Sequence, residues 1–171
     1  MKRIFKVSFL ALALTFALQS CGGKTAEKTE ETTTTTTMEE PAAVEETVSN
    51  DLSIDGNDAM QFSTNELRAK VGEITLTLHN VGKMDKAAMG HNVVVLKVGT
   101  DINAFGAKAA EAKATDYIPA SEAGSIVAHT KLLGGGESDT ITFSITEPGT
   151  YDYICSFPGH LALMKGKLIV E

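Results

Sequence analysis

The chain has 171 residues, 43% of them hydrophobic, which allows one ordinary domain with further segments outside it. Its net charge is −7 at pH 7, and nucleic-acid binding requires basic surface, so we expect no nucleic-acid partner. Tryptophan is absent, so a core must rest on aliphatic side chains and seven phenylalanines.

Residues 1–21 have the pattern of an export signal. Three basic residues among the first six precede an apolar run, 7–18, that is too short for a comfortable membrane span. The following Leu-Gln-Ser-Cys resembles a bacterial lipobox, so we expect Cys21 to be lipidated and to tether the protein to a membrane. Gln19 is not the commonest residue at its position, and a secretory signal cut nearby is the alternative.

Residues 22–49 are predicted to be a disordered linker. The segment holds an unbroken threonine run, 32–37, and seven glutamates, with almost no large apolar side chains. Such a composition cannot offset the entropy of ordering the chain, and its charge keeps it extended. We interpret it as a spacer between the membrane and a folded domain.

Residues 50–171 have the pattern of a β-rich domain. Residues 73–79 alternate with period two, which predicts a half-buried strand, and the β-branched run 92–98 predicts a strand buried on both faces. An Ala-rich stretch, 101–114, predicts one inserted helix that Asp101 can cap. Further strands are expected at 52–55, 61–63, 67–71, 126–133, 139–145, 150–156 and 163–170. The spacing predicts an all-β fold, an antiparallel Greek-key sandwich or barrel of seven to eight strands.

The stretch 155–164, Cys-Ser-Phe-Pro-Gly-His-Leu-Ala-Leu-Met, places a thiol, an imidazole and a thioether on one predicted loop. This soft and borderline set, Cys155, His160 and Met164, favours copper over calcium, magnesium or hydrolytic zinc. A blue-copper centre needs a second histidine, and His91 is the candidate because Gly90 allows close backbone approach. Asn92 can hydrogen-bond between loops. His129 is expected to be a surface histidine that binds no copper.

Four stretches within 50–171 resemble the azurin family of cupredoxins. They are Gly-Asn-Asp at 56–58 with Met-Gln-Phe at 60–62, Met-Gly-His-Asn at 89–92, Ala-His-Thr-Lys-Leu at 128–132, and the loop from Cys155 to Gly166. The last is the most specific, because the Cys-x4-His-x3-Met spacing and its Phe-Pro-Gly filler both match. The resemblance implies a cupredoxin fold and a one-electron carrier of bacterial periplasms with one type 1 copper ion.

The resemblance also implies a role for each site residue. His91, Cys155 and His160 become equatorial ligands, Met164 the weak axial ligand, and the Gly90 carbonyl the opposite axial contact. Backbone amides of Asn92 and Phe157 are expected to tune the site from outside the ligand set.

An apolar docking surface is implied around His160, whose outer edge is expected to reach solvent. Cytochromes c, nitrite reductases and peroxidases are the partners that the resemblance implies. The expected surface consists of Met60, Met84, Ala88, Met89, Phe157, Pro158, Gly159, Ala162 and Leu163.

One feature of azurins is missing. They generally carry a disulfide between the first and third strands, and the corresponding positions near Asn50 and Val71 hold no cysteine. The domain is therefore expected to hold together without that cross-link.

Three other functions use the same residues differently. A copper chaperone or storage protein would share the ligands but usually exposes clusters of Met or Cys. An enzyme with Cys155 as nucleophile and His160 or His91 as base would leave Met164 and Gly90 unexplained. A copper-free adhesion or signalling sandwich would leave the whole ligand set unexplained.

Overall fold

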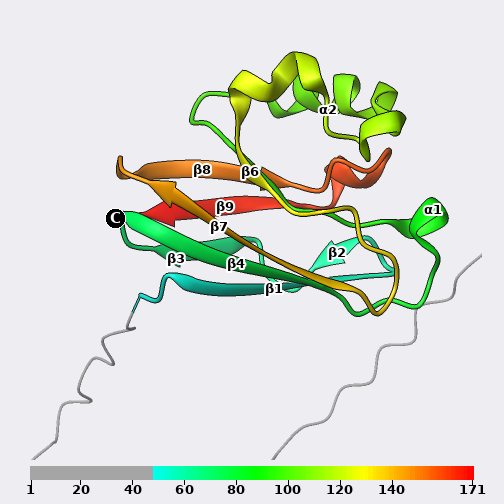
Figure 1. The fold of residues 1–171 in the computed structure, drawn as a ribbon, viewed down its shortest axis with the longest axis horizontal. Helices are drawn as coiled ribbons and strands as arrows, with labels where there is room; N and C mark the ends of the chain where they lie inside the picture. Colours follow the sequence, from blue (N-terminus) through cyan, green and yellow to red (C-terminus); the bar gives the residue numbers. More distant parts are fainter. Residues whose placement is uncertain (1–47) are drawn as a thin grey trace, which may run out of the picture. The chain divides into compact units, whose positions relative to one another are not determined.

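The structure, a computed structural model, describes residues 48–171 (Figure 1). The predicted signal segment, Cys21 and the linker up to residue 47 lie outside the described residues. The described part contains β1 (Asp51–Asn57), β2 (Gln61–Phe62), β3 (Glu66–Ala69), β4 (Gly72–Asn80), α1 (Lys86–Met89), β5 (Val94–Leu96), α2 (Ile102–Glu111), η1 (Lys113–Thr115), η2 (Ala120–Ser125), β6 (Ile126–His129), β7 (Ser138–Ile145), β8 (Gly149–Ile154), η3 (His160–Ala162) and β9 (Lys165–Val170).

The strands form two sheets that face each other. One has the order β2-β1-β4-β7 and the other β3-β9-β8-β5-β6. Apolar side chains from both sheets meet between them, which confirms the predicted sandwich. The described residues hold nine strands, one at each of the nine expected ranges, so the expected total of seven to eight was too low.

Two strand pairs are parallel, which corrects the expectation of a purely antiparallel sandwich. β1 runs parallel to β4, and β3 runs parallel to β9. Parallel neighbours cannot be joined by a tight hairpin, so the chain must leave the sheet between them. It does so here between β1 and β4, where β3 pairs in the opposite sheet.

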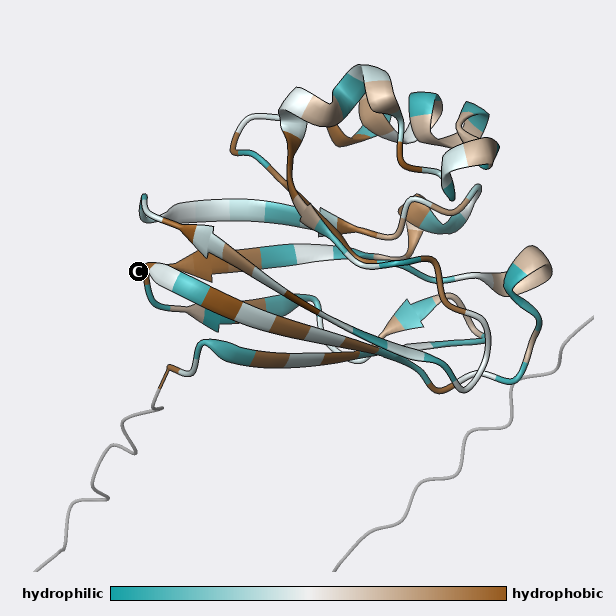
Figure 2. Ribbon diagram, in the orientation of Figure 1, coloured by the Kyte–Doolittle hydropathy of each residue, from teal (hydrophilic) through white to brown (hydrophobic). Residues whose placement is uncertain are grey.

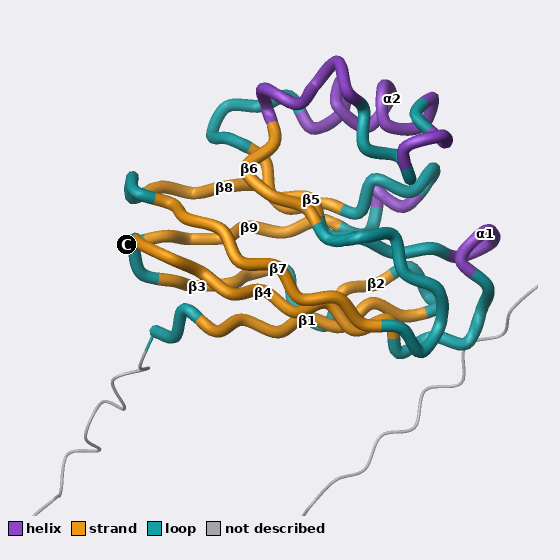
Figure 3. Tube along the Cα trace, viewed as in Figure 1, coloured by secondary structure: helices purple, strands orange, loops and turns teal. Residues whose placement is uncertain are grey.

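Burial along β4 and β5 agrees with the sequence pattern. In β4 the side chains of Ile74, Leu76 and Leu78 are buried and their neighbours are partly exposed, and Figure 2 shows the matching change of hydropathy along the strand. β5 is buried on both faces, because α2 covers its outer face (Figure 3). Phe105 and Ala109 of α2 pack there against a second apolar cluster.

One of the two α-helices among the described residues was predicted from the sequence and the other was not. Asp101 caps α2 as expected, since its Oδ1 accepts hydrogen bonds from two backbone N–H groups of the first turn. α1 was not expected, because a helix of four residues is too short to show a helical period in the sequence. The described helices include none long and apolar enough to cross a membrane.

β6 ends at His129, four residues earlier than the pattern predicts. After it, the Oγ1 of Thr130 accepts a hydrogen bond from the Val93 N–H at 3.0 Å. Leu133 then forms an isolated bridge with His91. The apolar residues at 132 and 133 are therefore buried against the site rather than in a strand.

Asn50 lies where the family disulfide would begin. Its Oδ1 accepts a hydrogen bond from the Lys70 N–H at 2.7 Å, and its Nδ2 donates to the Glu73 oxygen at 2.8 Å. One amide side chain thus links the start of β1 to both sides of the turn between β3 and β4.

Candidate metal centre

Three candidate ligand atoms converge at one end of the sandwich. His91 lies between α1 and β5, Cys155 follows β8, and His160 begins η3. One side-chain nitrogen of each histidine and the Cys155 sulfur all lie within 4.8 Å of one another, and all three residues are buried. The long loop between β4 and β5 and the loop between β8 and β9 therefore meet at a single site.

The tautomer of His91 follows from its hydrogen bond. Its Nε2 lies 2.9 Å from the main-chain oxygen of Asn57, and a carbonyl can only accept, so Nε2 carries the proton. Nδ1 is then a bare lone pair, buried and without a hydrogen-bond partner among residues 48–171. Leaving a buried polar atom unpaired costs about 1–3 kcal/mol. A metal ion would use that lone pair, and this atom is the direct structural indication that a metal fits.

Two glycines make room around His91. A Cβ on Gly56 would lie 3.2 Å from the Cδ2 atom of the His91 ring, so the β1 backbone and the ring are in close contact. A Cβ on Gly90 would lie 2.7 Å from the Lys86 oxygen and 3.0 Å from the Leu132 side chain. Glycine at position 90 thus allows the backbone of α1 and the Leu132 side chain to lie in close contact with the residue before His91.

The thiol of Cys155 lies in a dry environment. Its Sγ is 3.9 Å from the Gly90 oxygen and 3.6 Å from Nδ1 of His160. Burial raises the pKa of the Cys155 thiol to about 11, although hydrogen bonds from the backbone N–H groups of Asn92 and Phe157 act to lower the pKa. Both amides that the family pattern implies thus point at the sulfur. Without a cation the group is a neutral thiol at pH 7, and a metal ion would stabilise the thiolate.

Asn92 joins the two ligand loops. Its Oδ1 accepts a hydrogen bond from the Ser156 N–H, and its Nδ2 donates to the Ser156 hydroxyl, both at 2.8 Å. All these groups are buried. Ser156 was not singled out from the sequence, because a serine next to a candidate ligand has no distinguishing pattern.

The loop from Cys155 to Met164 folds back on itself. The Cys155 N–H donates to the Met164 oxygen at 2.9 Å, and the Met164 N–H donates to the His160 oxygen at 2.8 Å. Gly159 has a φ of 84°, the left-handed conformation that lets the chain turn into η3. Met164 is buried in one apolar cluster with Cys155, Leu132 and Phe157.

His160 lies between two other rings. Its centroid is 5.0 Å from that of His91 and 4.6 Å from that of Phe157. Burial, with a smaller effect from the nearby His91, lowers the pKa of His160 to about 4, and burial also lowers the pKa of His91. Both imidazoles are therefore neutral at pH 7, the form that binds metal. Only 2% of His160 is exposed, so the solvent-facing edge expected for it is very small.

The docking surface implied by the sequence is corrected at one residue. Phe157 is only 9% exposed and packs between Tyr117 and His160, so it belongs to the interior of the site. Met60 and Met89 are partly buried. The exposed members are Met84 (43%), Leu163 (60%), Ala88, Pro158, Gly159 and Ala162.

The remaining histidines stay apart from the site. His129 is exposed, and its Nδ1 lies 3.0 Å from the Thr130 oxygen. Nδ1 of His79 lies 2.8 Å from the Ser138 hydroxyl.

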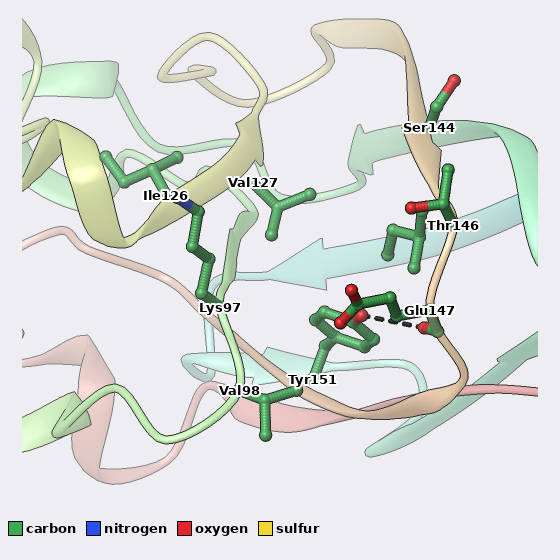
Figure 4. Close-up of a pocket in the computed structure, with 9 residues that line it drawn as sticks. Lys97, Val98, Ile126, Val127, Ser144, Thr146, Glu147 and Tyr151 are labelled. Atoms are coloured by element: carbon green, nitrogen blue, oxygen red, sulfur yellow. Dashed lines mark hydrogen bonds between the residues drawn. The ribbon is translucent and has the colours of Figure 1, made fainter.

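A surface hollow of about 480 Å³ lies at the other end of the sandwich, near the start of β8 (Figure 4). There the Tyr151 hydroxyl donates to the Glu147 oxygen, and no metal-binding cluster of the described residues lies in the hollow.

The chemistry of the site fits a metal better than covalent catalysis. A nucleophilic cysteine needs a lowered thiol pKa, whereas burial raises the pKa of Cys155. The proton on His91 is bound by a backbone carbonyl rather than by a carboxylate that could orient a catalytic base.

Comparisons with known proteins agree with this geometry. Residues 48–171 match the family described as "Copper binding proteins, plastocyanin/azurin family". The chain is 43% identical over 124 residues to azurin of Alcaligenes faecalis, covering 69% of this chain and 95% of that protein. It is 40% identical over 120 residues to outer membrane protein H.8 of Neisseria gonorrhoeae, covering 68% of this chain and 64% of that protein.

Solved structures give the same result. The structure of dithionite-reduced auracyanin from Roseiflexus castenholzii has a TM-score of 0.65 at 34% identity and covers 72% of this chain and 98% of auracyanin. An azurin from Methylomonas sp. strain J has a TM-score of 0.64 at 28% identity and covers 71% of this chain and 97% of that azurin. The buried His91, Cys155 and His160 cluster and these matches lead to one conclusion: the chain belongs to the plastocyanin/azurin family of copper-binding proteins, and its cofactor is copper.

Proposed function

We propose that the chain is a one-electron carrier with a type 1 copper centre held by His91, Cys155 and His160. Met164 and the Gly90 carbonyl would complete the ligand set as weaker contacts to the ion. The observation that carries the proposal is the buried, unpaired Nδ1 of His91 beside the Cys155 sulfur and the His160 ring.

Copper, when bound, supplies the one-electron Cu(I)/Cu(II) couple. The protein's contribution is a ligand set that changes little between the two states. The Asn92–Ser156 hydrogen bonds fix the two ligand loops against each other, and the Asn57 carbonyl fixes the His91 ring. Burial keeps water away from Cys155. A rigid, dry set of ligands suits rapid electron exchange and hinders release of the metal, which argues against a delivery function.

The exposed apolar residues near the loop support a transient docking face. Met84 and Leu163 provide its largest exposed apolar side chains. Methionine adapts to differently shaped surfaces, which suits brief contacts with several redox proteins. Cytochromes c, nitrite reductases and peroxidases are the proposed classes of partner.

The proposed location is the bacterial cell envelope, facing the periplasm. The support is the export pattern of residues 1–21, the lipobox-like residues before Cys21 and the acidic spacer 22–49. One relative carries the name outer membrane protein H.8. Mass spectrometry of the mature protein tests the anchor: the proposal requires an N-terminal fragment that starts at an acylated Cys21, and any other start refutes it.

An absorption spectrum of the copper-loaded protein tests the proposed function. We expect an intense thiolate-to-copper band in the visible region and a narrow copper hyperfine splitting, both reversibly lost on one-electron reduction. Cys155→Ser should abolish the colour, and His160→Gly should make the site respond to added imidazole. His129→Gly, a change at an exposed histidine, is the matched control and should stay blue. A colourless Cu(II) form of the wild-type chain would refute the proposal.

A further inference from the structure

A series of aromatic rings leads sideways from the site to the surface. The His160 and Phe157 centroids are 4.6 Å apart, and Phe157 and Tyr117 meet edge to face with centroids 5.1 Å apart. His160 and Phe157 are buried, whereas Tyr117 is partly exposed. Tyr117 is therefore the point at which this series reaches solvent, away from the small exposed edge of His160.

The backbone at Tyr117 is held in an unfavourable conformation. Asp116 and Tyr117 have φ values of 51° and 63°, in the left-handed region that disfavours side chains with a Cβ. The Tyr117 N–H donates to the Ala112 oxygen at 2.9 Å, and the Thr115 hydroxyl donates to the Ile118 oxygen at 2.7 Å. Two consecutive left-handed residues are uncommon, and here they place the Tyr117 ring against Phe157.

A hollow of about 170 Å³ lies beside Tyr117. Its apolar lining consists of Tyr117, Leu132 and Phe157. Its charged lining consists of Lys86 and Lys113 and one acidic residue, Asp116. Both lysines are exposed, and neither forms an ion pair within residues 48–171.

A second hollow shares Lys86, Leu132 and Asp116 and adds Lys131 and Glu137, and Lys131 forms an ion pair with Asp139 at 3.2 Å. Its charges therefore balance. The excess of positive charge lies at the hollow beside Tyr117, where Lys86 and Lys113 face one acidic residue in a protein that is acidic as a whole. It favours an anionic ligand over a cationic one.

We propose that Tyr117 and this lysine-flanked hollow form a lateral electron port for small anionic one-electron redox compounds, coupled to the centre through Phe157 and His160. The anion occupies the hollow beside Lys86 and Lys113 and accepts or supplies a single electron. No bond forms or breaks, and no proton moves. The inference rests on the proposed function, because it assumes a centre that exchanges one electron.

Binding is tested without any electron transfer. The probe is hexacyanochromate(III), an inert paramagnetic anion, added to the full-length chain in its metal-free form. In NMR spectra, the backbone amide signals of residues 113–117 and of Lys86 should broaden, because the paramagnetic ion lies close to them. Lys86→Gln with Lys113→Gln should remove that broadening. Lys70→Gln with Lys97→Gln is the control, because it changes the net charge equally at the other end of the sandwich, and it should leave the broadening intact.

Transfer is tested by stopped-flow oxidation of the reduced copper protein with hexacyanoferrate(III). At low ionic strength the Lys86/Lys113 pair of changes should slow oxidation roughly tenfold, since local charge steers small ions to a site. The Lys70/Lys97 pair should change it far less. Tyr117→Leu should slow oxidation severalfold, whereas Tyr117→Phe, which keeps the ring, should not. The absorption spectrum and the reduction potential should stay unchanged in every variant.

Two results would overturn the port. One is broadening that is spread evenly over all exposed lysines, and the other is a Tyr117→Leu variant that oxidises as fast as wild type with an intact spectrum. If Tyr117→Leu failed to fold, the two lysine pairs would decide, and equal slowing by both would refute the port. A wild-type chain that shows no copper–thiolate band would refute the proposed function instead, and the binding result would be unaffected.

Discussion

The Nε2 atom of His91 donates its hydrogen bond to the main-chain oxygen of Asn57 at 2.9 Å, and this single contact sets which nitrogen faces the metal site. Asn57 ends β1, and the turn that follows it is closed by a hydrogen bond from the Met60 N–H to the Asn57 oxygen at 3.0 Å. The first strand thus positions a ligand that follows it by more than thirty residues in the chain.

Gly56→Ala should disturb this contact without unfolding the domain. The new Cβ would lie 3.2 Å from the His91 ring, so the ring must shift by a few tenths of an ångström. Changes in groups that orient a ligand typically weaken metal binding about 10- to 100-fold, and a competition titration with a copper chelator would measure the loss. Gly124→Ala is the control, because a Cβ there meets nothing within 4 Å. Equal copper affinities for the two variants would show that the ring tolerates the shift.

Copper(II) uptake at pH 7.5 should release one proton per ion bound. The pKa of Cys155 is about 11 in the metal-free protein, so the thiol holds its proton at this pH and must lose it to bind as thiolate. The lowered pKa values of His91 and His160 mean that both imidazoles are already neutral at this pH, so neither loses a proton when it binds the ion. A titration in weak buffer with a pH indicator measures the release. Cys155→Ala should release none, and a release near two would mean that an imidazole is charged beforehand.

The metal-free domain should lose stability in acid. The pKa of His160 is about 4 in the folded state against an ordinary value of 6.5, so the unfolded state binds more protons between these values. Stability therefore falls as the pH drops from about 6.5 towards 4, by at most about 1.4 kcal/mol per pH unit for one proton. Urea unfolding at several pH values measures the slope. This dependence of the unfolding free energy on pH should become shallower in His160→Gln, and an unchanged slope in that variant would contradict the prediction.

Asn50→Ala should lower the free energy of unfolding by about 1–2 kcal/mol, the usual cost of losing side-chain hydrogen bonds of this kind. The change removes both the bond from the Lys70 N–H and the bond to the Glu73 oxygen. Urea unfolding of the metal-free protein measures the loss. Asn103→Ala on the exposed face of α2 is the control and should be nearly neutral. If Asn50→Ala and Asn103→Ala have the same free energy of unfolding, the Asn50 side chain does not replace any part of the missing cross-link.

Copper should raise the melting temperature of this domain, which lacks the family disulfide, because the ion binds the folded state and not the unfolded chain. Ligand at a thousand times its dissociation constant stabilises a protein by about 4 kcal/mol. For a domain of this size that corresponds to a rise of more than about 10 °C. Calorimetry of the metal-free and copper-loaded forms gives the difference, with Cys155→Ser as a form that should show little change on copper addition. Equal melting temperatures would contradict the expectation.

Local patterns in the sequence were sufficient for much of the fold. The alternation of apolar and polar residues along β4 matches the alternating burial of their side chains, because one face of the strand lies in the core. The helix α2 starts after Asp101 because that side chain caps it. The parallel pairings β1–β4 and β3–β9 could not be predicted in this way, since the direction of a neighbouring strand depends on where the chain crosses between sheets. α1 was missed because four residues are too few to show a helical period.

The ligand chemistry of the site follows from the sequence alone. Cys155, His160 and Met164 are near neighbours in the chain, so their spacing and ligand types are enough to indicate copper. The groups that support this chemistry depend instead on the tertiary structure. Gly56 and the Asn57 carbonyl reach the site from β1, and Ser156 joins it to Asn92 across the two ligand loops; the stretches that contain them resemble the family, but their contacts with His91 and Asn92 cannot be read from the sequence. The burial of Phe157 and its contact with Tyr117 likewise depend on how the segment after α2 folds over the loop, because burial and contact arise from packing between segments that are distant in the chain.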